Sequence, residues 1–333
     1  MFVLQSYLPA VFFCIITMFC WGSWANTQKL AKKEWRFELF YWDYTIGVLL
    51  LSIVSALTLG SMGSVGRSFF QDIAQADFNN ILSAAIGGAV FNAANILLVA
   101  AIAIAGMSVA FPVGIGLALA LGVVINYIAT PLGNPILLFV GVALVVAAIL
   151  FDAAAYKKIP GQSGSVSTKG LVLSVLCGIL MGFFYRFVAR AMSTDFVNLE
   201  AGKLSPYTAV FFFSVGVVAS NFVFNTIIMK KPFVGKPVPF SAYFKGGFRI
   251  HLIGILGGII WNIGMSLNII ASGQAGFAIS YGLGQGATLV AALWGVFIWK
   301  EFKAAPKSAN KLIALMFFCF VIGLGLIIIS RLA

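Results

Sequence analysis

Ten long apolar stretches constrain the fold of this chain more than any other feature of its sequence. A helix needs about 20 apolar residues to cross a hydrocarbon core of about 30 Å. Of the 333 residues, 61% are apolar and 9% are charged, whereas a soluble domain is about half apolar and about a quarter charged. Long continuous apolar runs are typical of membrane helices, because barrel strands show short alternating segments. The sequence therefore predicts an all-α polytopic membrane protein with spans at Tyr7–Ala25, Leu39–Gly60, Asn79–Ala105, Ser108–Ile128, Pro135–Asp152, Gly170–Met192, Tyr207–Met229, His251–Ala271, Gly276–Trp299 and Lys311–Arg331.

Basic residues are distributed unequally between the two sets of loops. The loops that follow odd-numbered spans carry sixteen lysines and arginines, and the opposite set carries four. Because basic loops stay on the cytoplasmic side, we expect the odd-numbered loops in the cytoplasm and both termini outside. The net charge of +12 then reflects topology, and we expect no nucleic-acid partner. The predicted location is the cell inner (plasma) membrane, within the lipid bilayer.

A stretch rich in Gly, Ser and Lys, residues 157–169, separates the chain into two parts of five spans each. This composition is typical of a flexible connector, which the predicted topology places in the cytoplasm. The sequence thus predicts a first five-helix unit over residues 1–156 and a second over residues 170–333.

The two halves contain similar segments at a constant offset. The sequence GGAVFNAANILL from Gly87 matches GGIIWNIGMSLN from Gly257, and AGMSVAFPVGIG from Ala105 matches AGFAISYGLGQG from Ala275, both 170 residues apart and without a gap. Chance similarity between apolar segments is the alternative, but the shared asparagine at 92 and 262 argues against it. Since each half has an odd number of spans, the second copy enters the membrane from the opposite side. Two inverted five-helix repeats are typical of secondary transporters, which bind substrate near the midplane between the repeats.

Several blocks of the sequence resemble a known group of transporters. They are WGSW from Trp21, YWDYTIG from Tyr41, GGAVFNAAN from Gly87, AVFFFSVGVVASNFVFN from Ala209, GQAGFAISYGLGQ from Gly273 and LWGVFIWKEF from Leu293. The chain resembles the drug/metabolite transporter superfamily, and within it the ureide permeases of plants. Bacterial glucose/ribose and rhamnose porters resemble it more distantly. The blocks cover both halves, but the long central loop of ureide permeases is here only the short 157–169 connector.

The resemblance implies uptake of heterocyclic nitrogen compounds, such as allantoin or nucleobases, together with protons. We therefore expect a secondary active importer of a small polar metabolite of ureide or nucleobase type, working by proton symport. Two alternatives stay open: a proton-coupled sugar porter of the glucose, ribose or rhamnose type, and a multidrug or metabolite efflux permease. The sequence also leaves a homodimer open.

Polar and aromatic residues near the middle of the spans are the candidates for a substrate site. Asn92 and Asn262 lie about half-way along their spans, where two amides can both donate to and accept from a polar ligand. The alternative is that each amide binds a neighbouring helix. Trp261 can stack on a planar or sugar ligand, or pack in the core. Gln285, with Tyr281 one turn earlier, is predicted to form a polar wall.

Three further residues are candidates nearer the membrane surfaces. Trp21 lies towards the cytoplasmic end of span one and is a substrate-binding candidate, although an aromatic belt at the membrane surface is the ordinary explanation. Arg186 within span six can bind a polar or anionic substrate group, or extend to the surface. Asp43 follows the start of span two, where a carboxylate suits reversible protonation, so we predict proton coupling there. Pairing with Arg36 is the alternative for Asp43.

The sequence contains few residues of the kinds that enzymes use for catalysis. No nucleophile–base pair, metal-ligand cluster or paired carboxylate is visible, and the sequence contains one histidine. We therefore expect no enzyme activity, no catalytic residue, no metal and no cofactor. The expected partners are a small-molecule substrate and protons.

Overall fold

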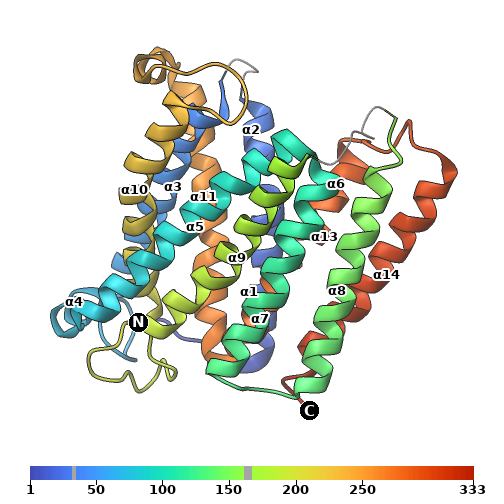
Figure 1. The fold of residues 1–333 in the computed structure, drawn as a ribbon. Helices are drawn as coiled ribbons and strands as arrows, with labels where there is room; N and C mark the ends of the chain where they lie inside the picture. Colours follow the sequence, from blue (N-terminus) through green and yellow to red (C-terminus); the bar gives the residue numbers. More distant parts are fainter. Residues whose placement is uncertain (32–34, 161–166) are drawn as a thin grey trace.

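The computed structural model describes residues 1–31, 35–160 and 167–333. Within these ranges the structure is helical, and ten helical segments are long and apolar enough to cross a membrane. The helices, shown in Figure 1, are α1 Tyr7–Ser23, α2 Asn26–Leu30, α3 Phe37–Leu57, α4 Phe69–Gln75, α5 Phe78–Ala105, α6 Met107–Ala110, the π-helix η1 Phe111–Ile115, α7 Gly116–Ala129, α8 Pro135–Tyr156, α9 Thr168–Ala191, α10 Pro206–Lys230, the 3₁₀-helix η2 Phe240–Lys245, α11 Phe248–Ala275, α12 Phe277–Gly284, α13 Ala287–Leu293, the π-helix η3 Trp294–Ile298 and α14 Lys307–Ile329.

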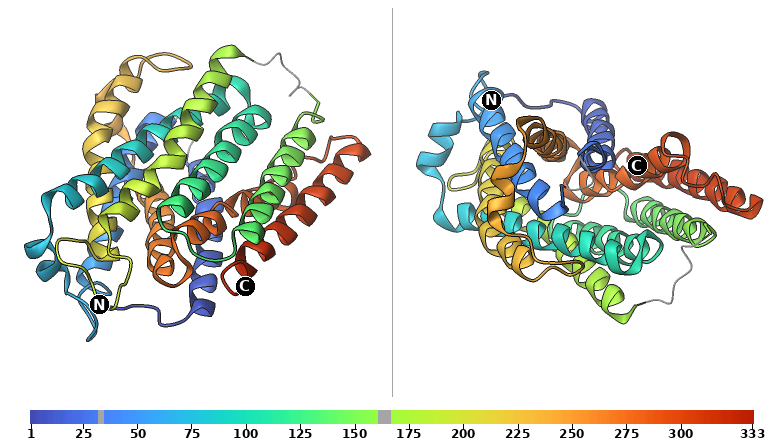
Figure 2. Two further views of the ribbon diagram at one scale, coloured as in Figure 1. Left: turned by 60° about the horizontal axis from the view of Figure 1, so that its bottom comes forward. Right: turned by 90° about the horizontal axis from the view of Figure 1, so that it is seen from above.

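The prediction of an all-α polytopic membrane protein is confirmed, and the predicted spans correspond to these ten segments. Both chain termini lie at the same end of the bundle, at the bottom of Figure 1. The opposite end carries α2, η2, the last turn of α8 and the first turn of α9. Residues 161–166 of the predicted connector lie outside the described residues. α8 and α14 pack together on one side, as the view from above in Figure 2 also shows.

Two predicted continuous spans are interrupted. Span four consists of α6, η1 and α7, and Pro112, which has no backbone N–H to donate, lies inside the π-helical turn. Span nine is broken at Gln285 and Gly286 between α12 and α13, and it ends in a second π-helix, η3. Irregular backbone within a membrane is tolerated where protein or a water-filled cavity surrounds it. These interruptions thus indicate where a cavity lies.

The segments that the sequence pairs at an offset of 170 have the same local structure. α5 and α11 each have 28 residues, and their bounds differ by the same offset. α5 is followed by Gly106 with φ 78° and ψ 164°, and α11 by Gly276 with φ 83° and ψ 156°. This region of positive φ is essentially restricted to glycine, so both helices require glycine at the same point.

α3 crosses α11 with the two backbones in close contact. A Cβ atom added to Gly47 would lie 2.1 Å from the carbonyl oxygen of Ile255, and one added to Gly258 would lie 1.9 Å from that of Tyr44. Real Cβ atoms do not approach oxygen this closely. The crossing therefore depends on the absence of a side chain at both glycines.

α10 crosses α5 in the same way. A Cβ atom added to Gly216 would lie 1.9 Å from the carbonyl oxygen of Ala85, and one added to Gly88 would lie 2.0 Å from that of Phe213. Gly88 and Ala85 stand 170 residues before the glycine and isoleucine that α11 uses in its own crossing. The two crossings are therefore built from matching positions in the two halves.

Candidate functional site

A cavity of about 310 Å³ lies between the helices of both halves. It is bounded by α1, α2, α5, η1, α9, α11 and the broken span nine. Part of its lining comes from the last turns of α1 and α5 and from α2, so it extends towards the end of the bundle opposite the termini. The lining residues are Trp21, Gly22, Trp24, Ala25, Gln28, Phe91, Asn95, Leu98, Val99, Ile102, Phe111, Ile115, Met181, Phe184, Trp261, Gln285, Ala287, Thr288 and Ala291.

Aromatic rings form one wall of the cavity, with Trp261 at their centre. The ring of Trp21 is nearly parallel to that of Trp261 at an angle of 13°, with centroids 5.8 Å apart. Phe213 lies at 5.9 Å and 16°, and Phe91 at 4.3 Å. The indole N–H of Trp21 donates to the backbone carbonyl of Trp261 over 3.1 Å, which fixes the pair. The structure thus brings both predicted tryptophans to the cavity.

Gln285 reaches the cavity from the break in span nine. The residue is 8% exposed, and its side chain makes no hydrogen bond to any described residue. Its amide atoms are not among the enclosed unpaired atoms, so they face open space. The backbone carbonyl of Gln285 accepts from the hydroxyl of Thr288 over 3.0 Å, which stabilises the turn. An amide that can donate and accept is therefore presented to the cavity.

Asn95 is a cavity residue that our sequence reasoning missed. It lies on α5 and is 3% exposed, and its Nδ2 donates to the hydroxyl of Tyr41 over 3.1 Å. Tyr41 is itself buried against Tyr44, with ring centroids 5.1 Å apart. The signal in the sequence was its spacing, since Asn95 follows Asn92 by three residues on the same helix. Gln28, Thr288, Phe91 and Phe184 were also missed.

Asn92 and Asn262 do not line the cavity, although both are fully buried. Asn262 donates from Nδ2 to the carbonyl of Val48 on α3 over 2.7 Å. Asn92 donates to the corresponding carbonyl, that of Val217 on α10, over 3.3 Å, and to the hydroxyl of Ser220 over 2.9 Å. Both amides therefore hold the two glycine crossings together in matching ways.

Tyr281 lies beneath the cavity, on the side of the chain termini. It is fully buried, and its hydroxyl is within hydrogen-bond distance of the carbonyls of Ala118, at 3.2 Å, and Met181, at 3.0 Å. Its ring packs against that of Tyr185, with centroids 5.2 Å apart, and the hydroxyl of Tyr185 contacts that of Ser280 at 3.0 Å. Both aromatic side chains are fully buried.

Arg186 is half-buried on α9 and does not line the cavity. Within the described ranges its guanidinium forms neither an ion pair nor a hydrogen bond. The structure thus separates it from the other candidates.

Asp43 lies in a polar cluster that is not part of the cavity lining. Its side chain is 1% exposed, and His251 Nδ1 lies 2.9 Å from Oδ1 and 3.0 Å from Oδ2. The hydroxyl of Tyr243 in η2 donates to Oδ1 over 2.5 Å. Burial, followed by the bond to Asp43, raises the pKa of the Tyr243 phenol, so it stays protonated as a donor. Arg36, the alternative partner from the sequence, instead pairs with Glu38.

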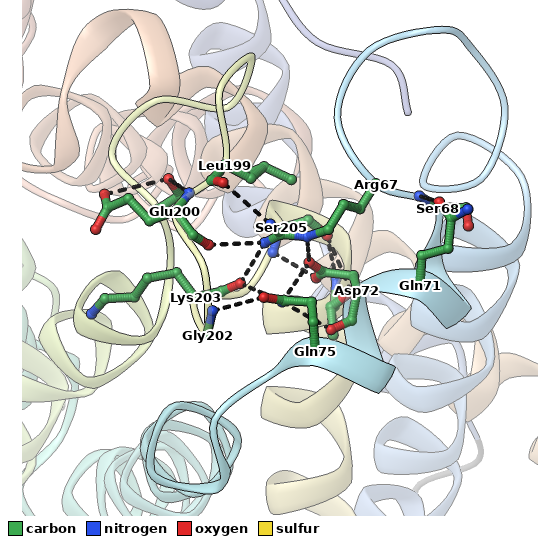
Figure 3. A network of polar contacts seen from close by, with 12 residues as sticks. Arg67, Ser68, Gln71, Asp72, Gln75, Leu199, Glu200, Gly202, Lys203 and Ser205 are labelled. Carbon is green, nitrogen blue, oxygen red and sulfur yellow. Dashed lines mark hydrogen bonds and ion pairs between the residues drawn. The ribbon is translucent and has the colours of Figure 1, made fainter.

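A second polar network joins two loops at the end that carries the termini, as Figure 3 shows. Asp72 is fully buried and accepts from Arg67 Nε over 2.8 Å and from the backbone N–H of Ser205 over 2.7 Å. Gln75 accepts from the backbone N–H of Gly202 over 2.7 Å. Arg67 also donates to the carbonyls of Leu199, Glu200 and Lys203. The network fixes α4 and the loop between α9 and α10 to each other.

The cavity itself is uncharged: none of the lining side chains in the described ranges is acidic, basic or histidine. Across the same ranges, the structure contains no group of three or more His, Cys, Asp or Glu side chains that could hold a metal ion. The site can thus hold a neutral molecule between aromatic rings and amides.

The comparisons with known proteins cover nearly the whole chain. The family model for ureide permeases matches residues 40–161 and 157–330, two segments that meet at the predicted connector. Ureide permease 1 of Arabidopsis thaliana is 23% identical over 99% of both chains, and Ureide permease 2 of the same plant is 21% identical over the same shares. Transmembrane protein 144 homolog B of Dictyostelium discoideum is 30% identical over 48% of this chain and 40% of its own.

A solved crystal structure of a protein has the same fold. It is 15% identical, superposes with a TM-score of 0.60, and covers 98% of this chain and 99% of its own. At this identity the likeness concerns the fold alone. The two family matches together span most of the sequence, and permeases are membrane transporters rather than enzymes. This chain belongs to the ureide permease family.

Proposed function

We propose that this transporter is a secondary active importer that carries a small, neutral, planar compound of ureide or nucleobase type through the central cavity. The observation that carries the proposal is the lining: aromatic rings surround uncharged amide groups from Asn95 and Gln285. Ureides and nucleobases combine flat rings with adjacent C=O and N–H groups, which amides can bind from both sides. The names of the Arabidopsis relatives support the same class.

The size and charge of the cavity limit its substrates. A volume of about 310 Å³ lies at the small end of the range for ligand sites, roughly 300–1,000 Å³. A large amphipathic drug therefore fits poorly, which argues against multidrug efflux. An anionic or cationic substrate would lack a charged partner in the lining.

For the mechanism, we propose alternating access between two inverted five-helix repeats, residues 1–156 and 170–333. The matching crossings of α3 with α11 and of α10 with α5 support this division. With the basic loops in the cytoplasm, the cavity extends inward, while Tyr281 and the Arg67–Asp72 network close the outer side. The structure would then correspond to an inward-facing state in a plasma membrane, with both termini outside.

Proton coupling is proposed at Asp43, together with His251. His251 Nδ1 lies 2.9 Å from Asp43 Oδ1 and 3.0 Å from Oδ2, and this pair joins α3 to the start of α11. α11 also carries Trp261 of the cavity wall, so a change in protonation acts on a helix that touches the substrate. The charged groups that flank the pair in sequence are Glu38 with its partner Arg36, Lys245 and Arg249.

Uptake into proteoliposomes tests the proposed function. Labelled allantoin should accumulate when an inward proton gradient is applied, and unlabelled uracil should compete. Glucose and rhamnose serve as competitors for the sugar alternative. If labelled allantoin does not accumulate but labelled glucose or rhamnose does, the proposal is contradicted and a sugar porter is favoured.

The proton site is tested by Asp43→Asn. This variant should exchange labelled for unlabelled substrate at the normal rate but lose gradient-driven accumulation, because the amide cannot bind the proton reversibly. Asp195→Asn is the matched control, since Asp195 is an exposed loop carboxylate that bonds Val197 and Asn198 nearby. If Asp43→Asn keeps the pH dependence of wild-type uptake, Asp43 is not the proton carrier.

A further inference from the structure

Three neighbouring rings cover the ring of Trp261. Trp21 and Phe213 lie nearly parallel to it, and the Phe91 centroid is 4.3 Å away. Trp261 is 4% exposed, although it lines the cavity. So little exposed surface cannot include a ring face, and a substrate cannot stack on Trp261 in this conformation.

What Trp261 does offer is the edge of its indole. Its N–H has no hydrogen-bond partner among the described residues, and Nε1 is not one of their enclosed unpaired atoms. The nearby indole of Trp21 differs, because its N–H is already used by the Trp261 carbonyl. An indole N–H is a donor only, with no tautomer or flipped form to reverse its role.

Resting on the proposed function, we infer that Trp261 is a specificity residue that donates its indole N–H to a carbonyl oxygen of the substrate. The packing around Trp261 fixes the direction of this donor before the substrate enters. Ligands with a carbonyl oxygen at that position satisfy the donor, and ligands without a good acceptor leave it unpaired in a largely apolar pocket. Discrimination of this kind is stronger than that from shape alone, because an unpaired buried polar group carries a desolvation cost.

The test replaces a carbonyl oxygen of the ligand by sulfur at the same ring position, because sulfur is a weaker hydrogen-bond acceptor. Unlabelled uracil, 2-thiouracil and 4-thiouracil compete with labelled allantoin for uptake, at a pH where all are neutral. Wild-type protein should prefer oxygen at one of the two positions. Trp261→Phe should reduce that preference by about 3- to 10-fold, as expected for one neutral hydrogen bond. A purely structural role would weaken all three competitors equally and leave the preference unchanged.

Trp42→Phe is the matched control. It removes an indole N–H that donates to the Met229 sulfur over 3.2 Å, away from the cavity lining, so it should keep the wild-type preference. If Trp261→Phe does not fold, a variant with benzothienylalanine at this position keeps the shape and lacks the donor. An unchanged preference in whichever Trp261 variant folds would overturn the inference. So would equal affinity of the wild-type protein for all three competitors.

Failure of the inference is distinguishable from failure of the proposed function. If wild-type protein takes up no allantoin and binds none of these carbonyl compounds, both are wrong. If it takes up allantoin but removal of the indole N–H leaves the oxygen preference intact, the proposed function stands and the role of Trp261 does not.

Discussion

Alanine at Gly47 or Gly216 should destabilise the protein, because each glycine lies directly against the backbone of another helix. An added Cβ would be 2.1 Å from the Ile255 oxygen in the first case and 1.9 Å from the Ala85 oxygen in the second. Ordinary contact begins near 3.4 Å. The helices must therefore separate by about 1.3 Å at Gly47 and about 1.5 Å at Gly216, the differences between these distances. Overpacking of a rigid site costs about 1–3 kcal/mol, and backbone atoms on both sides leave little room to relax.

This effect can be measured by thermal unfolding in detergent, with the fraction of protein that stays monodisperse after heating as the readout. Gly325→Ala on α14 is the control, because an added Cβ there meets no atom within 4 Å. It should be neutral or slightly stabilising, since alanine favours a helix by up to about 1 kcal/mol over glycine. The two crossing variants should lose similar amounts of stability because their positions match in the two halves. If either unfolds at the same temperature as Gly325→Ala, the close crossings do not constrain the fold as we argue.

Two further predictions concern polar side chains outside the cavity. Asn92→Ala and Asn262→Ala should each cost about 0.6–1.7 kcal/mol, the range for interhelical hydrogen bonds in membranes, and should leave the KM for uptake unchanged. Loss of uptake at wild-type stability would instead place these amides in the substrate site. Asp72→Asn should lower the unfolding temperature, because it breaks the buried ion pair with Arg67. We expect a loss of about 3 kcal/mol in the free energy of unfolding, at the low end for such pairs, since Arg67 is partly exposed. Unfolding that matches that of Asp195→Asn would show that the network adds no stability.

The spans could be predicted from the sequence because hydropathy and length nearly determine them. The second predicted span, Leu39–Gly60, corresponds to α3 at Phe37–Leu57, a shift of a few residues. The breaks within spans four and nine could not be predicted in the same way. Hydropathy does not depend on the direction of a backbone carbonyl. The break at Gln285 lies in a segment, Phe277–Ile298, that is still long and apolar enough to cross a membrane.

The cavity was predicted less completely, since helix rotation is set by packing that a sequence does not display. Asn92 and Asn95 lie one turn apart on α5, and both are polar residues at the depth expected for a substrate site. Gly88, pressed against Phe213, fixes the rotation of α5 so that Asn92 faces α10 and Asn95 faces the cavity. The availability of a ring face at Trp261 likewise depends on α1 and α10, which are distant in the sequence.

The equivalence of the two glycine crossings has a thermodynamic consequence. Each crossing is made by glycines packed against carbonyl oxygens and by one buried asparagine amide, so neither is intrinsically stiffer than the other. In alternating access between inverted repeats, the α3–α11 crossing takes up the geometry of the α5–α10 crossing, and the reverse. The interactions that break are then of the same kind as those that form. The two end states would then be nearly isoenergetic, and the direction of net flux would be set by solute and ion gradients rather than by the protein.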